Sequence, residues 1–351
     1  MQYYHAIGLM SGTSLDGLDM IYVRFQQTEH WNFKIIHCKT LSYDATWKKR
    51  LQEAIHLSGL DLMQLNADYG KFLGEKTQEF ITDYQIDTLD LIASHGHTVF
   101  HQPQKGFTLQ IGDGRWISEI TKQKVVYDFR SQDVALGGQG APLVPIGDAL
   151  LFSNYDYCLN LGGFSNISYQ HNNQRIAYDI CAVNTVLNTL CNRLNLEYDE
   201  GGKIAQNGVI NSELLQKLND LDYYKQAAPK SLGIEYVNQF IFPLLESSAE
   251  STENQIATFT EHIAVQIAKV VHPKTQLLIT GGGAFNHFLI EKIKEKSECE
   301  CIVPNADIIN YKEALIFAFL GVLRNLNQIN VLRSVTGASN NHSSGLIVNS
   351  F

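Results

Sequence analysis

The stretch that decides the fold reads Gly8-Leu9-Met10-Ser11-Gly12-Thr13-Ser14-Leu15-Asp16-Gly17-Leu18-Asp19. An apolar segment rich in strand formers, 3–9, precedes its centre and an alternating segment, 17–25, follows it, which predicts a turn between two strands. Glycines let backbone N–H groups approach an anion closely, and Thr13 and Ser14 add hydroxyl donors. The stretch lacks the Gly-Lys-Ser/Thr of a Walker A loop. It therefore indicates either a phosphate-binding turn or a plain glycine-rich hairpin.

Two later stretches repeat parts of this plan. In Asn160-Leu161-Gly162-Gly163-Phe164-Ser165-Asn166 a glycine turn again joins two predicted strands. In Thr280-Gly281-Gly282-Gly283-Ala284-Phe285 a buried strand runs into three glycines and then a helix, and bare backbone of this kind lets a flat nucleobase or ribose lie against it. Either stretch alone is weak evidence, because close packing is an alternative explanation of its glycines. Their order is more informative, because one glycine hairpin opens each half and a triple-glycine turn follows, which predicts a nucleotide held between two lobes.

The remaining elements predict an α/β protein of two similar lobes. The first lobe is expected at residues 1–128 with the first glycine turn, and the second at 129–351 with the two later motifs. The final predicted helix, 314–323, can pack back on the first lobe. The segment 130–145 contains three glycines and two prolines and is predicted to be a hinge or lid loop. Further strands are predicted at 33–43, 89–94 and 125–128, and helices at 46–57, 62–84 and 184–194.

Composition excludes several classes of protein. The 351 residues carry a formal net charge of −9, which argues against a general nucleic-acid binder. The longest apolar runs fall far short of the roughly 20 residues that span a bilayer. The N-terminus has no basic segment followed by a long apolar run, so no signal peptide is expected. None of the six cysteines forms a CxxC pair, which favours reduced thiols in a cytoplasmic protein. From the net charge and the short apolar runs we expect no nucleic-acid or membrane partner.

The order of the three glycine motifs resembles the phosphate-1, phosphate-2 and adenosine arrangement of the acetate/sugar kinase, heat-shock chaperone ATPase and actin superfamily. More narrowly, Leu9–Gly17 and Gly137–Pro145 are similar to signature runs of the anhydro-N-acetylmuramic acid kinase family, and the similarity covers nearly the whole chain. The resemblance implies an α/β fold of two ribonuclease-H-like lobes, a duplicated actin-like ATPase fold, with an interlobe cleft. It also suggests a homodimer.

The same resemblance implies a reaction. The family uses ATP and Mg²⁺, hydrolyses the 1,6-anhydro bridge of its sugar and phosphorylates O6, giving N-acetylmuramic acid 6-phosphate during peptidoglycan recycling. Asp179 matches the family's general base. One carboxylate suffices, because the leaving O6 attacks the γ-phosphorus and needs no separate acid. Without the resemblance, Asp179 would more simply be read as a cap or an Asx turn before the helix at Asn184.

Further site residues follow from the same match. Substrate contacts are expected from His97, Arg130 and Glu313, each of which could otherwise be an ordinary strand-end, surface or helix-end residue. His95, His97 and His101 also invite a zinc interpretation, which their spacing and the lack of a nearby ligand set disfavour. The expected ATP contacts come from the three glycine motifs and are Gly12, Thr13, Ser14, Leu15, Asp16, Gly17, Leu18, Asp19, Gly162, Gly163, Gly281, Gly282 and Gly283.

The chain departs from the family pattern near the expected sugar site. His97 stands where the family usually has glutamine, and 180–183, which directly follow Asp179, read Ile-Cys-Ala-Val. Two alternatives therefore stay open. One is a kinase of another anhydro sugar such as levoglucosan, and the other is a non-enzymatic nucleotide switch of the actin or chaperone kind.

Overall fold

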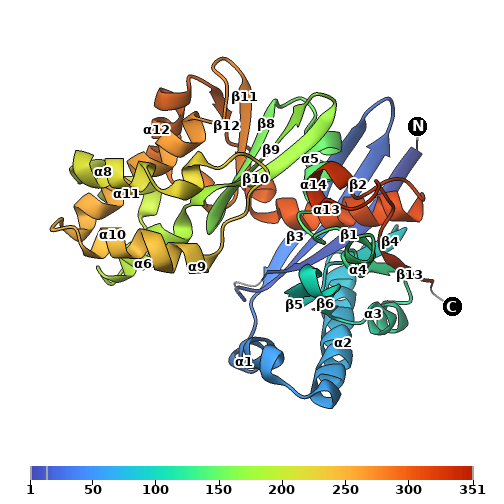
Figure 1. The fold of residues 1–351 in the computed structure, drawn as a ribbon. Helices are drawn as coiled ribbons and strands as arrows, with labels where there is room; N and C mark the ends of the chain where they lie inside the picture. Colours follow the sequence, from blue (N-terminus) through green and yellow to red (C-terminus); the bar gives the residue numbers. More distant parts are fainter. Residues whose placement is uncertain (1, 13–14, 350–351) are drawn as a thin grey trace. The chain divides into compact units, whose positions relative to one another are not determined.

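The computed structural model describes residues 2–12 and 15–349 of the chain. It divides into two compact units (Figure 1). The first unit contains the chain up to Leu151 and again from Tyr311 onward, and the second contains Phe152–Asn310. The lobe boundary that the sequence places after residue 128, and the interlobe cleft, remain predictions.

The first unit is built on a six-stranded sheet of order β13-β7-β4-β1-β2-β3. Strands β1, β2 and β3 are antiparallel neighbours, whereas β4 is parallel to β1 and β7 is parallel to β4. The hairpin β5–β6 forms a separate small sheet. The strands are β1 (Gln2–Ser11), β2 (Leu18–Gln27), β3 (Trp31–Leu41), β4 (Leu91–Ser94), β5 (His97–Gln102), β6 (Phe107–Ile111), β7 (Val125–Tyr127) and β13 (Leu346–Val348).

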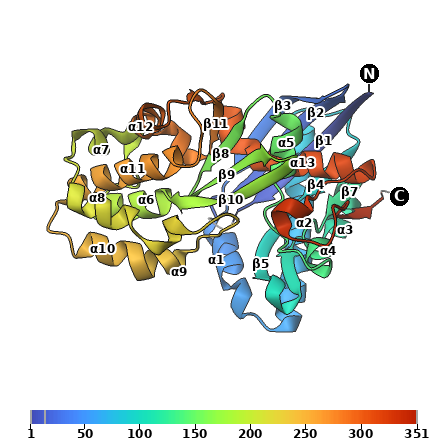
Figure 2. The same ribbon diagram turned by 45° about the horizontal axis from the view of Figure 1, so that its top comes forward.

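The second unit contains a five-stranded sheet of order β10-β9-β8-β11-β12. Strands β8, β9 and β10 are antiparallel neighbours and lie side by side in Figure 2, while β11 is parallel to β8 and β12 is parallel to β11. This is the pairing pattern of β1, β2, β3, β4 and β7 in the first unit, so the predicted α/β fold of two ribonuclease-H-like lobes is confirmed. The strands are β8 (Tyr157–Leu161), β9 (Phe164–His171), β10 (Gln174–Ala182), β11 (Gln276–Thr280) and β12 (Glu300–Ile302).

Helices cover both sheets. Those of the first unit are α1 (Ala45–Glu53), α2 (Gly59–Asp83), α3 (Gly114–Thr121), α4 (Ser131–Ala135), α5 (Pro145–Leu151), α14 (Arg333–Thr336) and the part of α13 (Ala306–Asn325) from Tyr311 on. Those of the second unit are α6 (Asn184–Asn192), α7 (Lys203–Asn207), α8 (Ser212–Asn219), α9 (Ile234–Tyr236), α10 (Phe242–Glu246), α11 (Thr252–Ala268) and α12 (His287–Ser297). None of the helices in the described part of the chain is long and apolar enough to span a membrane.

The alternation of β1 explains how the first unit is layered. Ile7 and Leu9 are buried in one core with Tyr69 of α2, because successive strand residues face opposite sides of a sheet. Gly8 faces the other way, and a Cβ on it would lie 2.1 Å from the carbonyl oxygen of Ala314. The backbone of α13 therefore touches β1 directly, and Figure 1 shows the red-orange helix beside the blue strand.

Two segments differ from the sequence-based expectation. The segment 130–145, predicted to be an irregular loop, contains the short helix α4 and ends where α5 begins. The helix predicted at 314–323 begins eight residues earlier, at Ala306, because the polar residues before Ala314 do not show the apolar run on which the prediction was based.

Candidate active site

In the first unit, Arg130 is held by two hydrogen bonds. Its Nε donates to Nε2 of His95 at 2.9 Å, and its Nη1 donates to the carbonyl oxygen of Gly140 at 2.7 Å. Nδ1 of His95 lies 2.9 Å from the carbonyl oxygen of Gly96, which can only accept, so the ring carries its proton on Nδ1. Burial and the charge of Arg130 hold the pKa of His95 well below its usual value, which agrees with a neutral ring. Arg130 is thus presented in a fixed orientation.

Glu313 on α13 shares a region of the first unit with Arg130 and Asp19. Solvent reaches the side chain of Glu313, but protein atoms surround it and poor hydration raises its pKa, an effect that Arg130 opposes and Asp19 reinforces. Burial lowers the pKa of Arg130 to about 10, against the effects of Glu313 and Asp133, so Arg130 still carries its charge at neutral pH. Two of the three predicted substrate contacts, Arg130 and Glu313, therefore act on each other's charge.

Asp19, at the start of β2, is a predicted ATP contact that follows the first glycine turn. Its Oδ1 accepts a hydrogen bond from the Thr40 hydroxyl at 2.6 Å. Burial raises the pKa of Asp19, the Thr40 hydroxyl opposes this and the nearby charge of Asp16 adds to it. The charge of Asp16 thus acts against the charged form of Asp19, an effect that a cation beside them would relieve.

His97 ends a buried chain of hydroxyl groups that the sequence did not reveal. The Tyr43 hydroxyl donates to Ser11 Oγ at 2.8 Å, and Ser11 Oγ lies 3.1 Å from Nδ1 of His97. Burial lowers the pKa of His97 to about 4, so its ring is neutral. With Ser11 donating to Nδ1, the ring proton sits on Nε2, and His97 can donate a hydrogen bond from that atom.

The first glycine turn is closed by a hydrogen bond from the Leu15 N–H to the carbonyl oxygen of Gly12, at 3.3 Å. Leu15 has a φ of 60°, the left-handed region that suits a tight turn. Asp16 is exposed. The predicted ligands Thr13 and Ser14 lie outside the described residues. Among the predicted ATP contacts of this turn, the buried residues are Leu15, Gly17 and Leu18.

In the second unit, Asp179 lies at a β-bulge near the end of β10. Asp179 pairs with Asn166 and Cys181 with Ser165, so Ile180 is the extra residue. Bulges of this kind re-aim side chains and are frequent beside active sites. The Tyr223 hydroxyl donates to the carbonyl oxygen of Asp179 at 2.6 Å and fixes the backbone there.

The carboxylate of Asp179 is held by one of its two oxygens. Oδ2 accepts from the N–H of Leu232 at 2.9 Å and from the hydroxyl of Ser231 at 3.2 Å. Within residues 2–12 and 15–349, no donor lies within hydrogen-bonding distance of Oδ1. Burial raises the pKa of Asp179, and the two donors oppose the rise. An oriented carboxylate with one uncommitted oxygen and a raised pKa is suited to accept a proton.

The second glycine turn lies at the beginning of α6. The carbonyl oxygen of Gly163 accepts from the N–H groups of Val183 and Thr185, and that of Gly162 accepts from Asn184. The start of a nine-residue helix and a glycine turn therefore meet at one place. Because these N–H groups donate to the turn, they hold it against the helix start, where the helix dipole favours an anion such as a phosphate.

The third motif lines a cavity of about 650 Å³ in the second unit. Gly281 has a φ of +81°, and a Cβ there would lie 2.6 Å from Asn160 Oδ1, so this position requires glycine. Gly282 is different, because a Cβ there would meet only Asn184, at 3.8 Å. Gly282 and Gly283 line the cavity together with the aromatic rings of Tyr198 and Phe285. A lining that combines bare backbone with partly exposed aromatic rings suits a flat heterocycle.

The histidine-rich segment has roles other than a metal cluster. His95 supports Arg130, His97 accepts from Ser11, and Nδ1 of His101 lies 3.2 Å from the Thr108 hydroxyl. Among the residues that the structure describes, no group of three or more His, Cys, Asp or Glu side chains is placed to hold a metal ion.

Comparison with known proteins identifies the family. The family model described as "Anhydro-N-acetylmuramic acid kinase" matches residues 2–350. A protein of that name from Francisella tularensis subsp. novicida (strain U112) is 32% identical over 367 residues, covering 96% of each chain. Another, from Vibrio vulnificus (strain CMCP6), is 33% identical over 363 residues, covering 97% of each chain.

Similarity to solved structures is more distant. The component A of (R)-2-hydroxyglutaryl-CoA dehydratase from Acidaminococcus fermentans matches with a TM-score of 0.46 and 12% identity, over 91% of this chain and 97% of that one. That likeness is too remote to add to the argument, which rests on the sequence relatives and on the strand pairing of the two sheets. From the family match over nearly its whole length, the chain belongs to the anhydro-N-acetylmuramic acid kinase family.

Proposed function

We propose that this protein is an ATP-dependent kinase that opens the 1,6-anhydro bridge of anhydro-N-acetylmuramic acid and phosphorylates O6, in peptidoglycan recycling. The observation that carries the proposal is the carboxylate of Asp179, held at Oδ2 by Leu232 and Ser231 while Oδ1 has no donor in the described part of the chain. In an ordinary sugar kinase the base takes its proton from a hydroxyl group of the sugar. In a kinase that opens the anhydro bridge the base takes its proton from water, and the oriented carboxylate of Asp179 can serve as that base.

The reaction has one proton transfer and three bond changes on the sugar. Oδ1 of Asp179 takes a proton from water, and the oxygen of that water attacks the anomeric carbon. The bond from that carbon to O6 breaks, and O6 takes the γ-phosphoryl group of ATP, so that ADP leaves. No separate acid is needed, because the departing oxygen is captured by phosphorus and not by a proton.

The nucleotide is expected to use all three glycine motifs. The cavity at Gly282 accepts the base and ribose, while the glycine turn at Gly162 and Gly163 lets the phosphates approach its backbone closely. Mg²⁺ usually binds through one or two carboxylates plus the phosphates themselves. Asp19, with Asp16 close by, fits that limited need and would hold the ion, which neutralises phosphate charge when bound.

The sugar is expected to contact the cluster of the first unit. Arg130 offers a charged, oriented guanidinium, and His97 can donate from Nε2. Glu313 completes the set as a carboxylate whose pKa is raised by poor hydration although solvent reaches its side chain, which suits an acceptor for sugar hydroxyl groups. We also propose that the protein works in the cytoplasm, where ATP is available, and forms a homodimer, which light scattering on the purified chain would test.

The proposal is tested by a coupled assay of ADP release across several sugars. ADP formation is expected with anhydro-N-acetylmuramic acid, and far less with N-acetylmuramic acid or N-acetylglucosamine, since these lack the bridge. A stronger response to levoglucosan would move the assignment to another anhydro sugar. ATP hydrolysis that no sugar changes would favour a nucleotide switch. In ¹⁸O-labelled water, the label is expected at the anomeric position of the product, and label in the phosphate ester would contradict the mechanism.

The pH profile should report on the hydrogen bonds to Asp179. In Ser231→Ala the carboxylate loses one donor to its charged form, so its pKa rises and the acidic limb of kcat/KM moves to higher pH. Ser247→Ala removes another exposed hydroxyl of the same unit, which donates to Leu244, and is expected to leave the limb in place. Identical acidic limbs in the two variants would show that Asp179 does not set the profile.

A further inference from the structure

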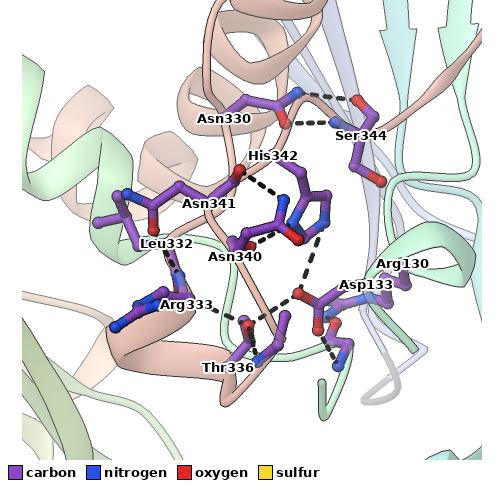
Figure 3. Close-up of polar contacts among 12 residues, drawn as sticks. Arg130, Asp133, Asn330, Leu332, Arg333, Thr336, Asn340, Asn341, His342 and Ser344 are labelled. Atoms are coloured by element: carbon purple, nitrogen blue, oxygen red, sulfur yellow. Dashed lines mark hydrogen bonds and ion pairs between the residues drawn. The ribbon is translucent and has the colours of Figure 1, made fainter. Parts of the chain in front are cut away.

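A buried carboxylate lies three residues after Arg130 in the chain and takes no part in the proposed reaction. Asp133 on α4 is 0% exposed. Its Oδ2 accepts from the N–H of Gly140 and its Oδ1 from the hydroxyl of Thr336, both at 2.7 Å (Figure 3). Nε2 of His342 lies 3.6 Å from Oδ1. A buried carboxylate is tolerated when it has partners of this kind, and removing one partner leaves a poorly compensated charge.

The glycines of the signature run shape the chain around this carboxylate. A Cβ on Gly138 would lie 2.2 Å from Oδ2 of Asp133. Gly140 has a φ of +70°, and a Cβ there would lie 2.9 Å from Val134. A side chain at either position would displace the loop from Asp133. Close packing on Asp133 is therefore enough to explain why glycine is needed at both positions, without a ligand contact.

The C-terminal segment holds the other side of the same loop. The N–H of Gln139 donates to the carbonyl oxygen of Thr336 at 2.8 Å, and the N–H of Ser339 donates to that of Leu136 at 3.0 Å. The hydroxyl of Ser344 donates to the carbonyl oxygen of Phe129 at 2.7 Å. Residues that follow α13 in the chain thus fix the backbone on both sides of Arg130.

Gly140 connects this buried network to the candidate site. Its N–H donates to Asp133, and its carbonyl oxygen accepts from Arg130 Nη1. We propose that Asp133, held by Thr336, is a positioning residue that orients Arg130 for the sugar through the backbone of Gly140. The inference rests on the proposed function, because it assigns a determinant of sugar affinity within the same site.

Two features make this more than a packing contact. Arg130 has a long flexible side chain that donates to the His95 ring and to the Gly140 carbonyl, and its guanidinium carbon lies 5.9 Å from the centre of the Phe317 ring. A displaced Gly140 therefore removes one of the two hydrogen bonds that fix the guanidinium. Asp133 also acts on Arg130 by charge, since it is one of the two groups that oppose the effect of burial on the arginine. A loosened arginine would bind the sugar less tightly, because it would have to be ordered on binding.

The test compares two buried threonine-to-valine changes in the first unit. Thr336→Val removes the hydroxyl that donates to Asp133, and Thr77→Val removes a hydroxyl that donates to Leu73 inside α2. Both side chains are buried. T336V is expected to raise the KM for the anhydro sugar about tenfold, the effect of one hydrogen bond, with the KM for ATP unchanged. T77V should alter neither, and Thr336→Ser, which keeps the hydroxyl, should restore the wild-type sugar KM.

A second readout does not depend on catalysis. Hydrogen exchange at the Arg130 Nε–H, followed by NMR, is expected to be faster in T336V than in wild type and unchanged in T77V. In an Arg130→Lys background, T336V should have little further effect on the sugar KM, because the group that it positions has gone. If T336V does not fold, Asp133→Asn takes its place with the same expectations, since it keeps the volume and one accepting oxygen.

Several results would overturn the inference. They are a T336V that matches T77V in sugar KM or in exchange at Arg130, equal rises in the KM for sugar and ATP, or additive effects of T336V and R130K. Wild type that releases no ADP with any anhydro sugar would instead refute the proposed function. In that case the exchange measurement still decides whether Asp133 orients Arg130.

Discussion

Asp179→Asn is expected to lower turnover by about two to four orders of magnitude, the usual contribution of a positioned base. The substitution keeps the size of the side chain, and its amide oxygen can still accept from the N–H of Leu232. The amide nitrogen then stands at the position of Oδ1, where it cannot take a proton from water. Steady-state ADP release with saturating sugar and ATP measures the effect.

Binding should survive in this variant. Calorimetric titration is expected to give wild-type affinity for ATP, since the glycine motifs are untouched, and sugar-ring opening should fall in step with ATP consumption. Asp222→Asn is the matched control, because Asp222 is a highly exposed carboxylate of the same unit, paired with Lys225. Near wild-type turnover in D179N, or a similar loss in D222N, would remove Asp179 from the mechanism.

Much of the fold was predictable because its signals are local. The hairpin of β1 and β2 follows from alternation on either side of a glycine turn, and β8 and β9 repeat it. The same local reading missed the hairpin of β5 and β6, where polar and histidine residues interrupt the pattern. It also predicted an irregular loop where α4 forms, since five residues give too short a window for helical periodicity.

The residues of the candidate site also differ in whether a local signal in the sequence predicts them. Asp179, Arg130 and Glu313 were predicted because each lies in a motif that can be matched along the chain. Asp133 was not predicted, although it is only three residues from Arg130. Its proposed role depends on a hydrogen bond from Thr336, which is 203 positions away. Ser231 was missed for a similar reason, since it acts on Asp179 across 52 positions. A sequence shows which residue types are present, but contacts of this span appear only when the chain is folded.

The triple-glycine turn allows nucleotide binding to be separated from folding. Gly282→Val is expected to weaken ATP binding about a hundredfold, equivalent to about 2.7 kcal/mol. Gly282 lines the cavity, and a Cβ there meets no atom closer than Asn184 at 3.8 Å, so the protein has room for the Cβ while the side chain occupies space that the nucleotide needs. The free energy of unfolding should change by no more than about 0.5 kcal/mol, as for ordinary surface substitutions.

Two other glycines, one distant and one adjacent to Gly282, supply the controls for this experiment. Gly59→Val, at a position with nothing within 4 Å, tests the same change away from the cavity and should leave ATP affinity unaltered. Gly281→Ala should instead reduce stability, because its φ is +81° and its Cβ would lie 2.8 Å from the carbonyl oxygen of Leu161. Calorimetric titration with a non-hydrolysable ATP analogue, paired with urea unfolding, distinguishes the three. If G282V binds the analogue as tightly as G59V does, the cavity at Gly282 is not the nucleotide site and the third motif is required only for packing.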